Sequence, residues 1–293
     1  MRRIAKKGCL GLLLFLLALT VVAVGFVYYQ AKRDPVGTPE YVALGSSFAA
    51  GAGLGQLETG SPLVCARSIN GYPQQLARME RLSIVDMSCG GAKTTHLLNG
   101  GQFFQGPQIR TIDRRTRLVT ITVGGNDIGY VGDMSLLAAR HSDSAWGWLV
   151  RHFWSGTSRH RNWARLEKEL VATIRAIHAR SPNATVVVAT YPTILPATGT
   201  CERVSLSSSE ANLMRAVGEH FAAVSRSAAM KSGAIFVDMN KLGASHDACS
   251  AKPWTNGYSG IAPFHPTLLG AKATASAIAS GLSKSPARVA AVR

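Results

Sequence analysis

The chain has 293 residues, of which 46% are hydrophobic and 16% are charged. This composition excludes an intrinsically disordered or collagen-like chain, and the length suffices to bury a substantial core. Lys and Arg number 32 against 16 Asp and Glu, giving a formal net charge of +16. That balance predicts contact with a polyanion, such as nucleic acid, an anionic membrane surface or the cell envelope.

The first segment in chain order is an apolar run. Residues 8–31 carry no charged side chain, and roughly 20 apolar residues span a bilayer as a helix. The positive-inside rule keeps the basic flank before the run in the cytoplasm and the rest of the chain outside. We therefore expect residues 1–31 to be a membrane anchor. A cleaved signal peptide is the alternative, with Ala23-Val24-Gly25 as its only passable cleavage site.

Residues 32–40 contain two prolines and a glycine and are typical of a short linker. We expect a single folded domain over residues 41–283, in which β-branched runs alternate with helical periodicity. Strands are predicted at residues 41–44, 83–86, 118–123, 185–189 and 234–237, and helices at residues 73–81, 163–180, 208–231 and 266–283. This alternation predicts an α/β fold with a parallel sheet covered on both faces and a site at the carboxyl ends of its strands.

Two segments fall outside the alternation. Residues 134–161 are rich in Trp, His and Arg and are expected to be an insertion after the third strand. This insertion is either a lid that binds acyl chains or faces a membrane, or a locally packed helical excursion. Residues 284–293 contain a proline and three basic residues, which is typical of a frayed tail.

The predicted topology also decides the state of the cysteines. Cys65, Cys89, Cys201 and Cys249 follow the apolar run and would meet an oxidising exterior, where an even number permits two disulfides. Sequence proximity favours Cys65–Cys89 and Cys201–Cys249 over the other pairings, and free buried thiols are the alternative. A zinc site is disfavoured because the chain has no C-x-x-C or H-E-x-x-H spacing.

Four residues suited to acyl transfer stand at the ends of predicted elements. Ser47 follows the first strand in Gly45-Ser46-Ser47-Phe48, where an exposed serine can attack a substrate if a base lies within reach. Gly91 and Asn126 follow the second and third strands, and their N–H groups suit an oxyanion. His265 precedes the last helix. Each alone is more typical of a turn, a cap or a surface residue, but their common sheet edge points to one site.

These residues resemble the sequence blocks of the SGNH hydrolase superfamily, the GDSL esterases and lipases, particularly its secreted actinobacterial members with disulfides. The resemblance covers residues 41–282. It implies a flavodoxin-like three-layer α/β/α sandwich, ester hydrolysis and no cofactor. It also implies that Ser47 is the nucleophile, that the N–H groups of Ser47 and Gly91 with the amide of Asn126 form the oxyanion hole, and that His265 is the general base.

Two positions depart from the family pattern. Ser46 replaces the usual aspartate before the nucleophile, which leaves the attacking group intact. Ala262 replaces the acid that normally stands three residues before the histidine and orients its ring. We expect the backbone carbonyl of Ala262 to hold the imidazole instead, with Asp247, tethered nearby if Cys249 is bridged, as the second candidate.

The sequence thus predicts an extracellular, membrane-anchored serine esterase or lipase that acts on lipid or O-acylated carbohydrate esters, or a secreted one if the signal is cleaved. A non-catalytic envelope-binding module that retains the fold is the alternative. The basic clusters are expected to form a solvated face or a surface for anionic lipid or wall polymer, and nucleic acid is disfavoured outside the cell. These clusters comprise Arg110, Arg114, Arg115 and Arg117, and in the insertion Arg151, Arg159 and Arg161.

Overall fold

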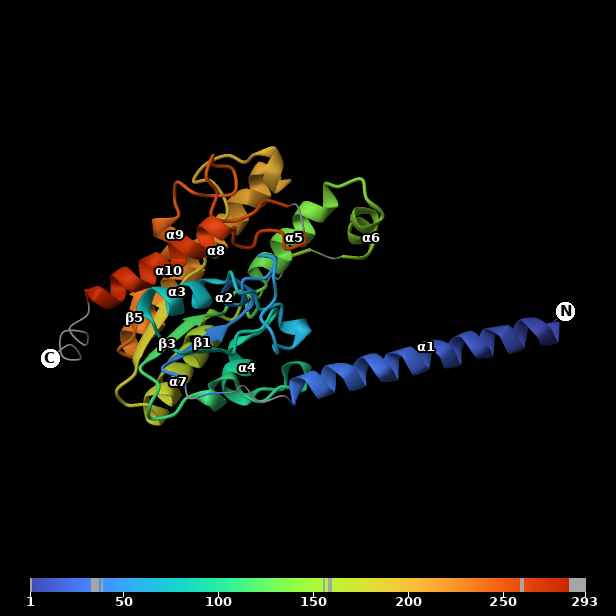
Figure 1. The fold of residues 1–293 in the computed structure, drawn as a ribbon. Coiled ribbons are helices and arrows are strands. Elements are labelled where there is room, and N and C mark those ends of the chain that lie inside the picture. The colour runs from blue at the N-terminus through green and yellow to red at the C-terminus, as the bar shows by residue number, and fades with distance from the viewer. Residues whose placement is uncertain are drawn as a thin grey trace.

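The computed structural model describes residues 2–32, 37, 39–154, 156–157, 160–258 and 261–284, with side chains from residue 11 onward. Its centre is a parallel sheet of five strands in the order β2-β1-β3-β4-β5 (Figure 1). The strands are β1 (Tyr41–Gly45), β2 (Ile84–Asp86), β3 (Leu118–Thr122), β4 (Thr185–Ala189) and β5 (Ile235–Val237). β1 and β3 are buried along their whole length, which explains why neither strand contains a charged residue.

The side chains of β1 alternate between two apolar clusters, one on each face of the sheet. Tyr41 and Ala43 belong to the cluster of α3 and α10, whereas Val42 and Leu44 belong to the cluster of α7 and α8. The sheet is therefore the middle of three layers. The helices of these layers are α3 (Tyr72–Glu80), α4 (Thr94–Asn99), α7 (Trp163–Arg180), α8 (Ser208–Lys231) and α10 (Leu268–Ser283).

The order 2-1-3-4-5 is that of flavodoxin-like folds, so the predicted three-layer α/β/α fold is confirmed. The last helix begins two residues later than expected. Thr267 is its N-cap, accepting a hydrogen bond from the backbone N–H of Gly270 at 3.1 Å. Pro266 therefore lies outside the helix, where it forms a β-bridge with Thr255.

The apolar N-terminal run forms one long helix, α1 (Arg2–Ala31). Its segment Gly11–Ala31 has a mean hydropathy of 2.6, and its most apolar stretch is not buried against the rest of the chain. By length and composition this helix is able to cross a membrane. Figure 1 shows α1 leaving the domain as an isolated rod.

The segment after β3 contains two helices, α5 (Tyr130–Arg140) and α6 (Ala145–Phe153). Arg161, expected on a basic face, is instead buried against α5 and forms an ion pair with Asp133 at 2.7 Å. It also donates to the carbonyl of Ile128. The guanidinium of Arg161 therefore stabilises this segment and does not contribute to a basic surface. Arg159 and the tail at 285–293 lie outside the described residues.

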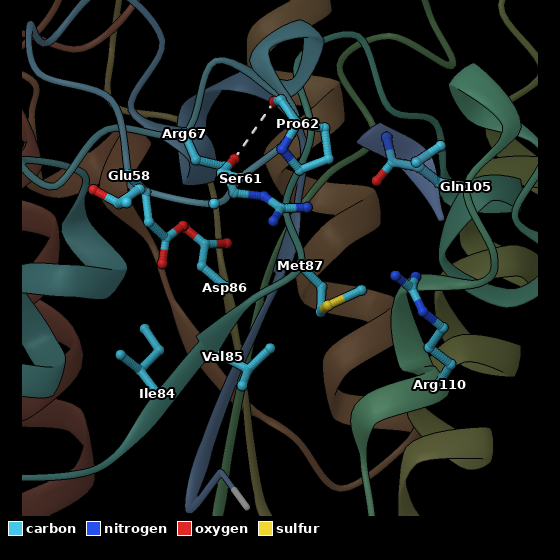
Figure 2. Close-up of a pocket in the computed structure, with 13 residues that line it drawn as sticks. Glu58, Ser61, Pro62, Arg67, Ile84, Val85, Asp86, Met87, Gln105 and Arg110 are labelled. Carbon is cyan, nitrogen blue, oxygen red and sulfur yellow. Dashed lines mark hydrogen bonds between the residues drawn. The ribbon is translucent and has the colours of Figure 1, made fainter. Parts of the chain in front are cut away.

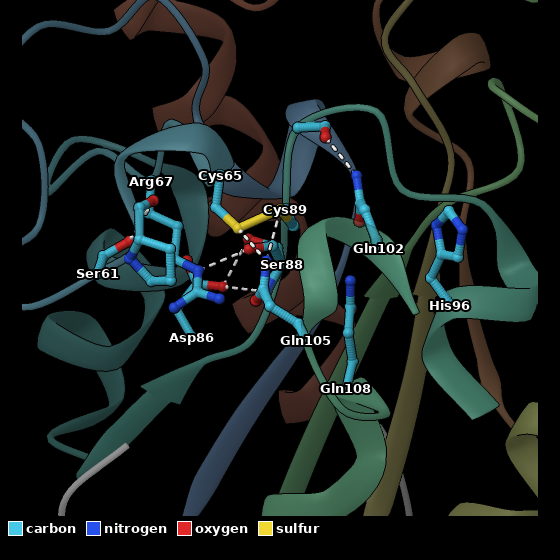
Figure 3. The surroundings of a disulfide bond; sticks show 12 residues. Ser61, Cys65, Arg67, Asp86, Ser88, Cys89, His96, Gln102, Gln105 and Gln108 are labelled. Atoms are coloured by element: carbon cyan, nitrogen blue, oxygen red, sulfur yellow. Dashed lines mark hydrogen bonds between the residues drawn. A yellow bond between two sulfur atoms is a disulfide. The ribbon is translucent and has the colours of Figure 1, made fainter. Parts of the chain in front are cut away.

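The two disulfides join Cys65 to Cys89 and Cys201 to Cys249, the pairing favoured by sequence proximity. Figure 3 shows the first bond beside the loop that follows β2. The Ser88 carbonyl in this loop accepts from Arg67 Nε at 2.6 Å, and the Gly90 carbonyl accepts from Gln102 Nε2 at 2.7 Å. The loop is thus fixed from both sides.

The remaining short elements connect these layers. They are α2 (Ser47–Ala50), α9 (Met239–Leu242) and the 3-10 turns η1 (Leu63–Cys65), η2 (Gln102–Phe104), η3 (Gln108–Thr111) and η4 (Glu202–Val204).

Candidate active site

Ser47 stands where the chain leaves the carboxyl end of β1. Gly45 makes this exit possible: its φ is +153°, and a Cβ there would lie 2.4 Å from the carbonyl oxygen of Thr122. A larger residue would push β1 and β3 apart. The next residue, Ser46, is fully buried, and its Oγ lies 2.7 Å from the hydroxyl of Tyr191. A hydroxyl thus replaces the family's aspartate without leaving a buried charge.

His265 reaches Ser47 from the loop before α10. The residue before it, Phe264, is buried with a φ of 63°, a left-handed conformation that turns the chain sharply. The Phe264 N–H donates to the Gly257 carbonyl at 3.0 Å, and the His265 carbonyl accepts from the N–H of Asn256 at 2.8 Å. These bonds fix the loop so that Nε2 of His265 lies 2.7 Å from Oγ of Ser47.

The other ring nitrogen has a partner that differs from the expected one. Nδ1 of His265 lies 2.8 Å from the carbonyl oxygen of Pro263, whereas the carbonyl of Ala262 accepts the backbone N–H of His265 at 3.3 Å. The expectation for Ala262 is therefore wrong by one residue, because the turn at Phe264 folds the ring back over Pro263. Asp247 is engaged elsewhere, its Oδ1 accepting from the N–H of Cys249 at 2.7 Å.

This partner fixes the tautomer of the imidazole. A carbonyl oxygen only accepts hydrogen bonds, so Nδ1 of His265 carries the proton and Nε2 is left as the acceptor facing Ser47. Burial lowers the pKa of His265 below its usual value, and the hydrogen bond to Pro263 opposes part of that effect. The ring is accordingly neutral at pH 7, which is the form able to accept a proton from Ser47.

A cavity of about 260 Å³ brings the four candidate residues together. Its lining includes Ser47, Gly91, Asn126 and His265. Gly91 has a φ of +77°, which directs this exposed backbone as few other residues allow. Asn126 Nδ2 donates one proton to the carbonyl of Ala92 at 2.9 Å. Because an amide nitrogen carries two protons, this bond orients the side chain and leaves the second proton for another acceptor.

The turn that carries Asn126 is tied to the start of α4. The next residue, Asp127, accepts from the Thr94 backbone N–H at 3.1 Å and from the Thr94 hydroxyl at 2.6 Å. Glu169 of α7 contacts the same hydroxyl. Burial raises the pKa of Asp127, and the bonds from Thr94 oppose this. These contacts connect the loops after β2 and β3, from which Gly91 and Asn126 come.

Sequence reasoning missed two aromatic residues of the cavity. Tyr191 follows β4, and its ring stacks on that of Phe48 with centroids 3.6 Å apart. Phe48 in turn lies 5.1 Å from the His265 ring. Like Asn126, Tyr191 is a polar residue just beyond the end of a strand. The residues around it form no recognisable motif, so nothing in the sequence singled it out.

A second cavity, of about 300 Å³, lies beside β2 (Figure 2). It is lined by Glu58, Arg67 and Asp86, and one carboxyl oxygen of each acid is buried without a hydrogen-bond partner among the described residues. Burial, reinforced by the charge of Asp86, raises the pKa of Glu58 to about 7. Burial also raises the pKa of Asp86. This cavity shares no lining residue with that of Ser47.

Comparisons with known proteins show which proteins this chain is similar to. Lipase 2 of Streptomyces coelicolor is 31% identical over 83% of this chain and 85% of its own length. The crystal structure of an extracellular lipase from Streptomyces rimosus has 29% identity and a TM-score of 0.67, covering 82% of this chain and 98% of that chain. The structure of phospholipase A1 from Streptomyces albidoflavus NA297 has 26% identity and a TM-score of 0.66, covering 84% and 100%.

The family model for the GDSL-like Lipase/Acylhydrolase family matches residues 43–273. This range contains the four candidate residues and both disulfides. The resemblance noted in the sequence is therefore confirmed, and with it the expected class of enzyme, a carboxylic ester hydrolase. The chain belongs to the GDSL-like lipase/acylhydrolase family.

Proposed function

We propose that the protein is a membrane-anchored extracellular esterase in which Ser47 is the nucleophile and His265 the general base. The observation that carries this proposal is the 2.7 Å separation of Ser47 Oγ and His265 Nε2, with Nδ1 held by the carbonyl of Pro263. The nucleophile, the base and the group that orients the base then form the hydrogen-bonded chain that acyl transfer requires. The orienting group is a backbone carbonyl, which makes the pair a dyad.

The reaction proceeds in two halves. Oγ of Ser47 attacks the ester carbonyl carbon while its proton passes to Nε2 of His265, and the imidazolium then gives that proton to the departing alcohol. An acyl group remains on Ser47. In the second half Nε2 takes a proton from water, whose oxygen attacks the acyl carbon. The bond to Oγ breaks, the proton returns to Ser47, and the carboxylic acid leaves.

The N–H groups of Ser47 and Gly91 and the second amide proton of Asn126 are the proposed donors to the oxyanion. Their support is the common cavity and the bond from Asn126 to Ala92, which restrains the amide before substrate arrives. The carbonyl of Pro263 is a neutral dipole and stabilises imidazolium less than a carboxylate would. The oxyanion donors therefore supply a larger share of the catalysis than in a triad.

Attachment to the cell membrane by α1 is part of the proposal. Its support is the apolar length of Gly11–Ala31 together with the basic residues before it, which favour a cytoplasmic N-terminus. The two disulfides favour an oxidising compartment for the rest of the chain. The relatives named as lipases and the neighbour named as a phospholipase favour lipid esters over acylated carbohydrates as substrates.

Turnover of p-nitrophenyl butyrate tests the catalytic proposal. Ser47→Ala and His265→Ala should each lower kcat by at least about 10³-fold, with thermal midpoints close to that of the unaltered protein. Ser250→Ala and His246→Ala are matched controls outside the cavity and should retain activity. Retained turnover by Ser47→Ala would overturn the proposal. An unaltered protein with no activity on any ester, but with affinity for an anionic polysaccharide, would favour the non-catalytic module.

A further inference from the structure

Helix α6 carries large apolar side chains that face away from the domain. Only Gly147 and Val150 of this helix are buried. A Cβ on Gly147 would lie 2.6 Å from the carbonyl oxygen of Ala139, so this side of α6 is packed closely on the last turn of α5. The exposed fractions of the outward side chains are 56% for Trp146, 50% for Trp148, 41% for Leu149 and 77% for Phe153.

These exposed residues lie on one broad side of the helix. Trp146, Leu149 and Phe153 are spaced by three and four residues, which places them on one face. Trp148 extends this face, and its ring lies against that of His152 in a tilted arrangement with centroids 4.4 Å apart. Tryptophan and phenylalanine gathered on one side of a surface helix, opposite the side packed on the protein, are typical of helices that lie in the membrane–water interface.

Hydrogen bonds fix the position of α6, so its apolar face has a defined orientation relative to the domain. Ser144 caps the helix by accepting from the N–H of Gly147 at 3.0 Å. Arg151 donates to the carbonyls of Arg140 and Ser142, each at 2.7 Å. These bonds tie α6 to the last turn of α5, and the buried pair of Arg161 with Asp133 holds the same segment further along.

α5 connects this helix to the candidate active site. Val131, Gly132 and Ser135 of α5 line the cavity that contains Ser47 and His265. The helix that forms one wall of the cavity therefore leads directly into α6. An interfacial position of α6 would bring the cavity close to the lipid surface.

The direction of α1 indicates which partner α6 meets. In Figure 1, α6 projects from the same side of the domain toward which α1 extends. Tyr28 near the end of α1 contacts Phe104 of η2, with ring centroids 5.7 Å apart. Tyr28, Tyr29, Phe103 and Phe104 are all exposed, so the junction of α1 with the domain carries aromatic side chains of the kind enriched at membrane–water interfaces.

We propose that α6 lies in the headgroup–acyl boundary of the bilayer that α1 crosses and presents the cavity to lipid esters in that bilayer. Trp146, Trp148, Leu149 and Phe153 bury their apolar surfaces among the acyl chains, while Gly147 and Val150 keep the helix on α5. This inference rests on the proposed anchoring by α1. It adds a second point of contact that fixes the orientation of the domain, which a single tethering helix leaves free.

Tryptophan fluorescence of the full-length chain in phosphatidylcholine vesicles tests this contact. Because the phosphatidylcholine headgroup has no net charge, binding to these vesicles reports apolar insertion and not electrostatic adsorption of the basic protein. Phospholipids brominated on their acyl chains should quench the unaltered protein, and the double variant Trp146→Phe/Trp148→Phe should lose most of this quenching. Trp254→Phe, which alters a tryptophan stacked on His246, is the matched control and should retain it. Equal quenching in the double variant would overturn the proposal.

A second arm measures the consequence for catalysis. Trp146→Ser/Phe153→Ser should hydrolyse p-nitrophenyl palmitate embedded in the vesicles at least about tenfold more slowly than the unaltered protein, because the apolar contact is lost. Its turnover of soluble p-nitrophenyl butyrate should stay within about twofold, since neither residue lines the cavity. Equal losses on both substrates would contradict an interfacial role. A variant that self-associates less in detergent but is quenched as strongly as the unaltered protein would also contradict it, because the apolar face would then contact a second copy of the chain.

The two arms separate this inference from the proposed function. Retention of the unaltered protein in vesicles after alkaline carbonate extraction reports on α1 alone, and butyrate hydrolysis reports on Ser47 and His265 alone. If both succeed and quenching of Trp146 and Trp148 is absent, the inference fails and the proposed function stands. If butyrate hydrolysis fails, the quenching arm still decides where α6 lies.

Discussion

Aromatic side chains have opposite environments in two neighbouring regions of the molecule. At the cavity, Phe48 and Tyr191 are buried and stack at 3.6 Å, and Phe48 lies 5.1 Å from the ring of His265. On α6, Trp146 and Phe153 are exposed. The first pair is held by the sheet and positions a reacting group, whereas the second has no such role inside the domain. Residues of the same type thus serve the chemistry in one region and, by our inference, the lipid in the other.

The largest effect expected in the cavity, after loss of the nucleophile or base, comes from the oxyanion donor. Asn126→Ala should lower kcat by about 10²–10³-fold, since removing one such donor costs roughly 3–4 kcal/mol in the transition state. KM should change little because the interaction forms mainly in the transition state. Asn212→Ala, at an exposed position on α8, is the control. Steady-state kinetics on p-nitrophenyl butyrate measures both, and an unchanged kcat in Asn126→Ala would remove Asn126 from the oxyanion hole.

The pH profile tests the environment of His265. Burial places its folded-state pKa below 6.5, so kcat/KM should be constant above pH 6.5 and fall about tenfold per unit below the lowered pKa. Because the unfolded chain binds this proton more readily, His265 also makes the fold less stable as the pH falls through the same window. An acid limb of kcat/KM with a midpoint above 6.5 would show that burial does not control this ring.

The smallest effect is expected at Asp247. Asp247→Asn should change kcat by less than about threefold, because the Pro263 carbonyl holds Nδ1 and the Asp247 carboxylate caps the turn at Cys249. Asp113→Asn, at the surface, is the control. A fall of several hundredfold in Asp247→Asn with the thermal midpoint preserved would replace the dyad by a triad.

The sequence was sufficient to predict the fold and four residues of the cavity because both depend on local patterns. Buried parallel strands such as β3 are continuous β-branched runs, and Ser47, Gly91 and Asn126 each follow a strand. Which carbonyl holds His265 was not predictable, because that choice follows from the positive φ of Phe264. Whether Nδ1 of His265 meets one carbonyl or the carbonyl of the next residue depends on the long-range hydrogen bonds of this loop. No periodicity in the local sequence reveals those bonds.

The segment after β3 illustrates the same limit for packing. Its composition predicted an insertion and left open whether that insertion faces a membrane or packs locally. It did not predict that Arg161 would be buried against Asp133 while the aromatic residues of α6 face outward. Burial of a charged residue and exposure of apolar ones oppose the usual partition. Only the arrangement of α5 and α6 in space shows which side chains of this segment are buried and which are exposed.

Covalent labelling tests the central claim most directly. The intact mass of the full-length chain after treatment with a fluorophosphonate should increase by one phosphonyl group, and peptide mapping should place that group on Ser47. His265→Ala should be labelled at least about 10²-fold more slowly, because no base then takes the proton from Ser47. A chain that stays unlabelled, or carries the group on another serine, would contradict the account.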